Sequence, residues 1–243
     1  MAYAVLTRDA ADVGPYAAAL ASLGLEVVPM PVTAIVAPAD PGALRRAMVA
    51  GPFDGVVVTS RRVAAALADA ARACGVQLPA VWAVGEATRA ALAGAGIAAQ
   101  CMDGVRDGAE LGRSLVATRS RQRVLVPRAE EGREELVAIL RAAGWEVVEV
   151  IAYRTVALAA TDPARARGAA LLEAGEAAVC CVFAPSQVAA LGHAVAAATA
   201  WVAIGETTAA ALRAAGAVRV AVADAPTPEG IAKAAGAVYR SRP

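Results

Sequence analysis

The chain has one histidine, His193, and one lysine, Lys233, among its 243 residues. A single histidine excludes a histidine-rich zinc site and leaves little scope for a Ser-His-Asp triad. The lone lysine lies close to the C-terminus, which disfavours a Schiff-base enzyme. Four cysteines are present without a C-x-x-C pair. At this chain length they argue against a disulfide framework.

The chain also lacks an excess of charge of either sign. Lysine and arginine total 23, aspartate and glutamate total 22, and the net charge is +1. This balance argues against a strongly basic nucleic-acid-binding protein. The first residues carry neither a basic region nor a long apolar run, so no secretory signal is expected.

One stretch, residues 177–205, has no Asp, Glu, Lys or Arg and is long enough to span a bilayer. It contains Pro185, Gly192 and His193, and most of its apolar residues are alanine. These features favour a strand, a turn, a helix and a second strand instead. We therefore predict a cytoplasmic protein with no membrane and no nucleic acid among its partners.

Hydrophobic residues make up 58% of the chain and charged residues 19%, which suffices for a buried core. Short valine-rich runs are typical of buried parallel strands, and each precedes an Ala/Leu/Arg stretch of helical period. This alternation predicts an α/β fold with parallel sheets. The expected strands are residues 3–6, 56–58, 81–84, 124–126, 179–183 and 202–204.

The two halves of the chain resemble each other at a shift of 120 residues. AVGEATRAALAGAG at 83–96 falls on AIGETTAAALRAAG at 203–216, and LGLEVV at 23–28 falls on AGWEVV at 143–148. VVVTSRRVAAAL pairs with CVFAPSQVAALG at a slightly longer shift. An internal duplication explains these ordered matches and predicts two similar α/β domains. Residues 27–38 and 147–158 are expected to be extended strands that cross between them.

Ligands of open parallel sheets bind beyond the carboxyl ends of the strands. In this sequence those ends carry small residues, hydroxyl residues and arginines, and each opens a helix. A helix N-terminus offers free N–H groups and a positive dipole end, which suit a carboxylate or a phosphate. The alternative is that each Ser or Thr is a plain helix cap. The groups are residues 7–8, 59–62, 85–88, 127–128, 184–186 and 205–208.

Across essentially its whole length the chain resembles the uroporphyrinogen-III synthase family. The order and spacing of several short segments carry the resemblance, and no phosphate-binding G-x-x-x-x-G-K-[ST] loop or G-x-S-x-G elbow competes with it. The segments are VLTR, VVVTSRR, AVGEATRAAL, VLVPRAEEGREELVAILRAAGWEVVEVIAYRT, VFAPSQV, AIGETTAAALRAAG and APTPEGIAKAA.

The resemblance implies two flavodoxin-like domains joined by a two-stranded β connection, one of residues 1–35 plus 156–243 and the other of residues 36–155. It implies closure of the linear tetrapyrrole hydroxymethylbilane to uroporphyrinogen III, with loss of water and inversion of ring D through a spiro intermediate. No cofactor and no metal are implied. The expected protein is a monomer that serves tetrapyrrole biosynthesis (haem, sirohaem, cobalamin or chlorophyll-type) and contacts hydroxymethylbilane synthase transiently.

By position, Tyr153 in IAYRT matches a family tyrosine that assists loss of the hydroxyl as a general acid. A role as a hinge packing residue is the alternative for it. The other matching residues lie at strand ends, where the resemblance implies contacts with the substrate. They are Arg8, Ser60, Arg62, Thr88, Arg128, Ser186, Thr207 and Thr208.

Two positions depart from the family pattern. Arg61 stands where the family often has proline, and Ala184 replaces the usual serine before Pro185, which leaves only Ser186 with a hydroxyl there. The main alternative function is a non-catalytic two-domain protein that binds a small anion in a cleft. A two-domain glycosyltransferase and a tetrapyrrole-binding regulator are weaker alternatives.

Overall fold

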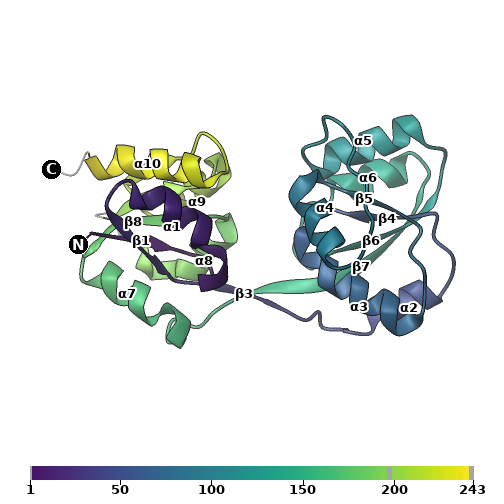
Figure 1. The fold of residues 1–243 in the computed structure, drawn as a ribbon, viewed down its shortest axis with the longest axis horizontal. Helices are drawn as coiled ribbons and strands as arrows, with labels where there is room; N and C mark the ends of the chain where they lie inside the picture. The colour runs from purple at the N-terminus through teal and green to yellow at the C-terminus, as the bar shows by residue number, and fades with distance from the viewer. Residues whose placement is uncertain (1, 196–198, 241–243) are drawn as a thin grey trace. The chain divides into compact units, whose positions relative to one another are not determined.

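The computed structural model describes residues 2–195 and 199–240. The chain forms two compact units. Unit 1 comprises Met1–Ala34 and Val156–Pro243, and unit 2 comprises Ile35–Thr155. Both boundaries fall inside strands, one in β3 (Thr33–Val36) and the other in β7 (Glu146–Ala157) (Figure 1).

Unit 1 is built on a five-stranded sheet of order β10-β9-β8-β1-β2, in which every paired neighbour is parallel. Helices cover both of its faces, and short 3-10 turns join them (Figure 1). The strands are β1 (Ala2–Leu6), β2 (Leu25–Pro29), β8 (Ala177–Val182), β9 (Ala200–Ala203) and β10 (Arg219–Val222). The helices are η1 (Ala10–Asp12), α1 (Gly14–Ala21), η3 (Pro163–Arg165), α7 (Ala166–Glu173), α8 (Pro185–Leu191), η4 (Gly192–Ala194), α9 (Glu206–Ala214) and α10 (Pro228–Arg240).

The strands of unit 1 are hydrophobic on both sides because both faces are buried. Successive side chains of a strand point to opposite faces. Thus Ala4 and Leu6 pack in a core with α1 and α10, whereas Val5 packs in a second core with α8 and α9. The valine-rich runs of the sequence reflect this double burial.

Unit 2 has a sheet of order β3-β7-β6-β4-β5, and Gln100 adds a parallel bridge beside Trp82 at the β5 edge. Its further strands are β4 (Gly55–Val58), β5 (Ala80–Ala83) and β6 (Arg123–Ala129). One core packs helices α2, α3 and α4 against the sheet, and the other packs α5 and α6. The helices are α2 (Ala43–Val49), η2 (Arg61–Val63), α3 (Ala64–Cys74), α4 (Gly85–Gly94), α5 (Gly108–Thr118) and α6 (Glu135–Ala142).

The expected α/β architecture is confirmed, with two parallel-rich sheets of five strands each. Each of the six predicted strands overlaps an observed one, namely β1, β4, β5, β6, β8 or β9. The uncharged stretch 177–205 forms β8, α8, η4 and β9, with residues 196–198 outside the described part. Among the described residues, no helix combines the length and the apolar character needed to cross a membrane.

Burial separates the four cysteines into two chemical classes. Burial raises the pKa of Cys181 to about 12 and that of Cys180 well above its usual value. Because the thiolate is the reactive form, both should resist a thiol reagent at pH 8, whereas exposed Cys101 should react quickly. A thiol titration checks this: Cys180 and Cys181 should react only after denaturation, and rapid labelling of either in the folded protein would contradict the prediction.

Candidate active site

Unit 2 brings Tyr153 of β7 to the loop that follows β4. The Tyr153 hydroxyl lies 3.0 Å from Ser60 Oγ, at hydrogen-bond distance, and either atom is able to donate. Ser60 Oγ also accepts a hydrogen bond from the backbone N–H of Arg62 at 3.3 Å, as the N-cap of η2. Ser60 is therefore a helix cap and a partner of Tyr153 at once.

A pocket of about 380 Å³ opens at this place. Ser60, Tyr153 and Arg128 line it, together with Gly108 at the first turn of α5. A volume of this size is at the lower end of the range for small-molecule sites. Tyr153 is 8% exposed, so its ring is held by the core while its hydroxyl reaches the pocket.

Arg128 is one of three arginines, with Arg106 and Arg133, that line this pocket beside Asp107, Glu131 and Glu135. Its side chain is 16% exposed and its Nε lies 2.9 Å from Glu149 Oε2. Glu149 also pairs with Arg141 at 2.9 Å, so one carboxylate faces two guanidinium groups. Nη1 of Arg128 is buried and has no hydrogen-bond partner among the described residues. The guanidinium is therefore paired with Glu149 on one side and has a buried, unpaired nitrogen at Nη1.

The matched helices α4 and α9 place a threonine in the first turn of each. Thr88 is 5% exposed and Thr208 is 1% exposed, whereas Thr207 is exposed. The preceding glutamates pair within their own helices. Arg89 lies 2.7 Å from Glu86 and lowers the pKa of that carboxyl. Glu206 likewise lies 2.6 Å from Arg213, so each glutamate is paired with an arginine of its own helix.

In unit 1, Arg8 follows β1 and lies against two aromatic rings. Its guanidinium carbon is 4.2 Å from the Phe183 ring centroid and 4.9 Å from that of Tyr16. No hydrogen bond or ion pair involves this side chain within the described residues. Ser186 lies exposed in the first turn of α8.

Ala184 occupies the N-cap position of α8, with extended backbone and no side-chain cap. The family serine expected there would cap the helix. We expect Ala184→Ser to raise the free energy of unfolding by about 1 kcal/mol, because its hydroxyl would satisfy a free N–H of the first turn. Thermal unfolding checks this, with exposed Ser186→Ala as the matched control of little effect. An unchanged Tm for Ala184→Ser would contradict the cap assignment.

The predicted site residues gather at the carboxyl edges of the two sheets. Ser60, Arg128 and Tyr153 share one pocket in unit 2, and Arg62 is exposed beside it. Thr88 lies after the neighbouring strand β5. In unit 1, Arg8, Ser186, Thr207 and Thr208 follow β1, β8 and β9.

Sequence reasoning missed Gln187, Tyr16 and Phe183, which surround Thr7 and Arg8 in unit 1. The available signal was Gln187 in the first turns of α8, two residues after Pro185. Tyr16 gives no signal of its own because it lies on an ordinary apolar helix face.

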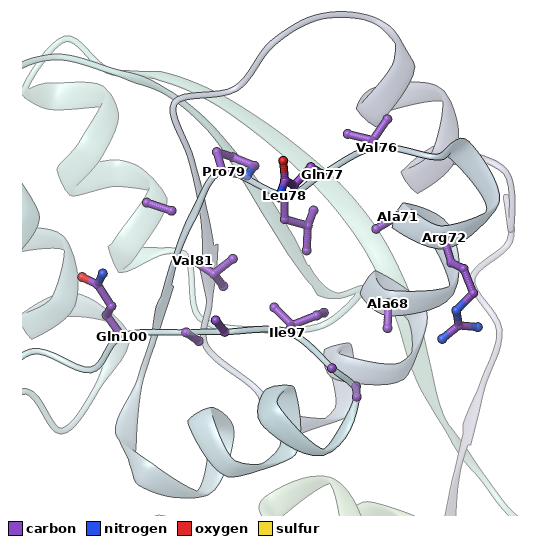
Figure 2. Close-up of a pocket in the computed structure, with 15 residues that line it drawn as sticks. Ala68, Ala71, Arg72, Val76, Gln77, Leu78, Pro79, Val81, Ile97 and Gln100 are labelled. Atoms are coloured by element: carbon purple, nitrogen blue, oxygen red, sulfur yellow. The ribbon is translucent and has the colours of Figure 1, made fainter.

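A larger pocket of about 580 Å³ lies elsewhere in unit 2. It is bounded by the end of α3, the segment that leads into β5 and the segment after α4 (Figure 2). Aliphatic side chains such as Leu78 and Ile97 line it, and Arg72 at its side pairs with Asp69 at 3.0 Å. It lies near the amino end of β5, away from Ser60 and Tyr153. Its lining offers little chemistry.

Together these features define a class: a two-unit α/β protein with open parallel sheets that present hydroxyl and arginine side chains at their carboxyl edges. The sequence model of the uroporphyrinogen-III synthase HemD family matches residues 14–233. The chain belongs to this family, whose enzymes are cyclising lyases of tetrapyrrole biosynthesis. A comparison with curated proteins gives no match.

Solved structures of the family share the fold. A mutant uroporphyrinogen III synthase from the extremely thermophilic bacterium Thermus thermophilus is 20% identical, with a TM-score of 0.61 and 100% of each chain covered. The uroporphyrinogen-III synthetase of Helicobacter pylori 26695 is 17% identical, with a TM-score of 0.66, and 98% of this chain and 100% of that chain are covered. Among the described residues, no group of three or more His, Cys, Asp or Glu side chains is placed to hold a metal.

Proposed function

We propose that this protein closes hydroxymethylbilane to uroporphyrinogen III, with Tyr153 as the general acid. The observation that carries the proposal is the hydrogen bond between Tyr153 and Ser60 at the wall of a pocket that also contains Arg128. A buried phenol with its oxygen at a pocket is suited to deliver one proton. The family to which the chain belongs gives the reaction.

In the proposed first step, Tyr153 donates its proton to the hydroxyl of the substrate, which leaves as water. Ser60 favours this direction if its O–H points to the Tyr153 oxygen, because the phenolic proton is then free for the substrate. The Arg62 N–H, which donates to Ser60 Oγ, holds that serine in place. The same Ser60 donor then stabilises the phenolate left after proton transfer.

The remaining work is positioning, because the linear substrate also closes spontaneously to the type I isomer. Holding its carboxylates restricts it to the folded shape that leads through the spiro intermediate. We propose Arg8, Arg62 and Arg128 as charged contacts for the acetate and propionate groups. The proposed hydroxyl contacts are Ser60, Thr88, Ser186, Thr207 and Thr208.

A coupled assay tests the activity. Hydroxymethylbilane is generated in situ by its synthase, the protein is added, and the oxidised products are separated into type I and type III uroporphyrins. Predominant type III is expected. If folded protein yields only the type I isomer, the proposed enzymatic activity is wrong, and a non-catalytic protein that binds a small anion is favoured instead.

We further propose that each unit is a flavodoxin-like domain and that the two arose by duplication, joined through β3 and β7. The sheet order supports this, because β2-β1-β8-β9-β10 corresponds to β7-β6-β4-β5 followed by the Gln100 bridge. Unit 1 then has the flavodoxin-like strand order along its own chain. Unit 2 has the same arrangement in space, with β6 and β7, the last strands of its chain segment, in the places that β1 and β2 take in unit 1. We also propose that the protein is a monomer in the cytoplasm and that it receives its substrate from hydroxymethylbilane synthase.

A further inference from the structure

In unit 1 a side-chain amide fills the gap where two central strands separate. β1 ends at Leu6 and β8 at Val182, and α8 directs Gln187 between them. Gln187 Oε1 accepts hydrogen bonds from Thr7 Oγ1 at 2.7 Å and from Phe183 N at 2.8 Å. Its Nε2 donates to the Thr7 carbonyl oxygen at 2.8 Å. Gln187 thus adds one more rung where the strand ladder has ended.

The next residue along the chain from this rung is Arg8. Its guanidinium lies against Tyr16 and Phe183, whose rings meet edge to face at 5.0 Å. Arg8 Nε is buried without a hydrogen-bond partner among the described residues. The two rings hold the guanidinium by cation–π contact. Gln187 holds the backbone of Thr7, which precedes Arg8, and that of Phe183, whose ring contacts Arg8. A rigid arginine without a carboxylate partner is suited to an incoming anion.

The corresponding gap in unit 2 is built differently. By the match of CVFAPSQV to VVVTSRRV, Arg62 stands at the position of Gln187. Arg62 is exposed, and the gap between β4 and β6 borders the pocket of Ser60 and Tyr153. Ligands of doubly wound sheets bind at such a gap. The gap between β4 and β6 in unit 2 thus opens into a pocket, whereas the side chain of Gln187 fills the gap between β1 and β8 in unit 1.

We propose that Gln187 is a positioning residue: through Thr7 and Phe183 it holds Arg8 in place to bind a carboxylate of the substrate. The inference rests on the proposed function, for which the substrate is a polycarboxylate. Under this proposal the carboxyl edges of the two sheets have different roles. The edge of unit 2 takes the reacting group into its pocket, and the edge of unit 1 binds charge through a fixed arginine.

Steady-state kinetics with hydroxymethylbilane test the inference. Arg8→Met and Gln187→Met should each raise KM about tenfold, as expected for a lost hydrogen bond to a charged group, with kcat nearly unchanged. The double variant should be no worse than Arg8→Met alone, because both changes remove one contact. Val188→Ala is the matched control. Val188 is the next residue of α8 and is 4% exposed, so its variant should lose thermal stability and keep the wild-type KM.

If Gln187→Met does not fold, Thr7→Val replaces it, because it removes the Thr7 hydroxyl and keeps the shape of the side chain. Its KM should rise, by less than that of Arg8→Met. Wild-type KM in the Gln187 or Thr7 variant, or additive effects in the double variant, would overturn the positioning role. Wild-type protein that yields only the type I isomer would instead overturn the proposed function, and the inference with it.

Discussion

Replacement of Tyr153 by Phe should lower kcat about a hundredfold and leave some type III product. General acid catalysis contributes roughly 10²–10⁴-fold, and a phenol, as a weak acid, belongs at the low end. The residual activity follows because the pocket still positions the substrate. The Phe side chain keeps the packing of Tyr153, so KM and Tm should change little. Initial rates and the ratio of the isomers measure the effect.

Substitution of Ser60 tests the role of Tyr153 in a second way. Ser60→Ala should lower kcat in the wild-type background, because Tyr153 loses its hydrogen-bond partner. In the Tyr153→Phe background the same change should lower kcat much less, since the phenol through which Ser60 acts on the first step is gone, and the lost substrate contact of Ser60 should remain as a rise in KM. Full activity of Tyr153→Phe would remove the tyrosine from the mechanism and leave its packing role.

Local sequence patterns predicted the strands that are buried on both faces. Valine runs such as 56–58 and 179–183 lie in β4 and β8 because parallel strands between two helical layers carry apolar side chains on both sides. β10 (Arg219–Val222) escaped this criterion. It is an edge strand whose four residues are all only partly buried, so its sequence lacks a continuous apolar signal.

The contacts of the site depend on sheet order, which local patterns do not contain. Ser60 and Tyr153 are 93 residues apart, and Thr7 and Gln187 are 180 apart. They meet because β4 and β7 both flank β6, and because β1 and β8 are neighbours. The sequence placed Thr7 and Ser60 after the carboxyl ends of strands and Tyr153 in an expected crossing strand, but it could not tell which of these segments would be adjacent.

Gly55 is the residue whose substitution should cost unit 2 the most stability. It opens β4, the strand that leads to Ser60, and a Cβ placed on it would lie 2.0 Å from Cζ3 and 2.5 Å from Cη2 of Trp82. Trp82 is 2% exposed and packs between the sheet and α5. The indole therefore has no free space to move into, and close-packed interiors respond to added atoms with strain.

We expect Gly55→Ala to lower the free energy of unfolding by about 3 kcal/mol, at the upper end of the usual cost of overpacking. Gly94→Ala is the control, because no atom lies within 4 Å of its added Cβ and alanine favours a helix over glycine by about 1 kcal/mol. Urea unfolding followed by near-UV circular dichroism measures both. Because β4 positions the Ser60 loop, Gly55→Ala should lose cyclase activity at a lower temperature than Gly94→Ala. Equal unfolding midpoints would mean that Trp82 can move aside and that the packing of β4 against β5 is not what fixes the site.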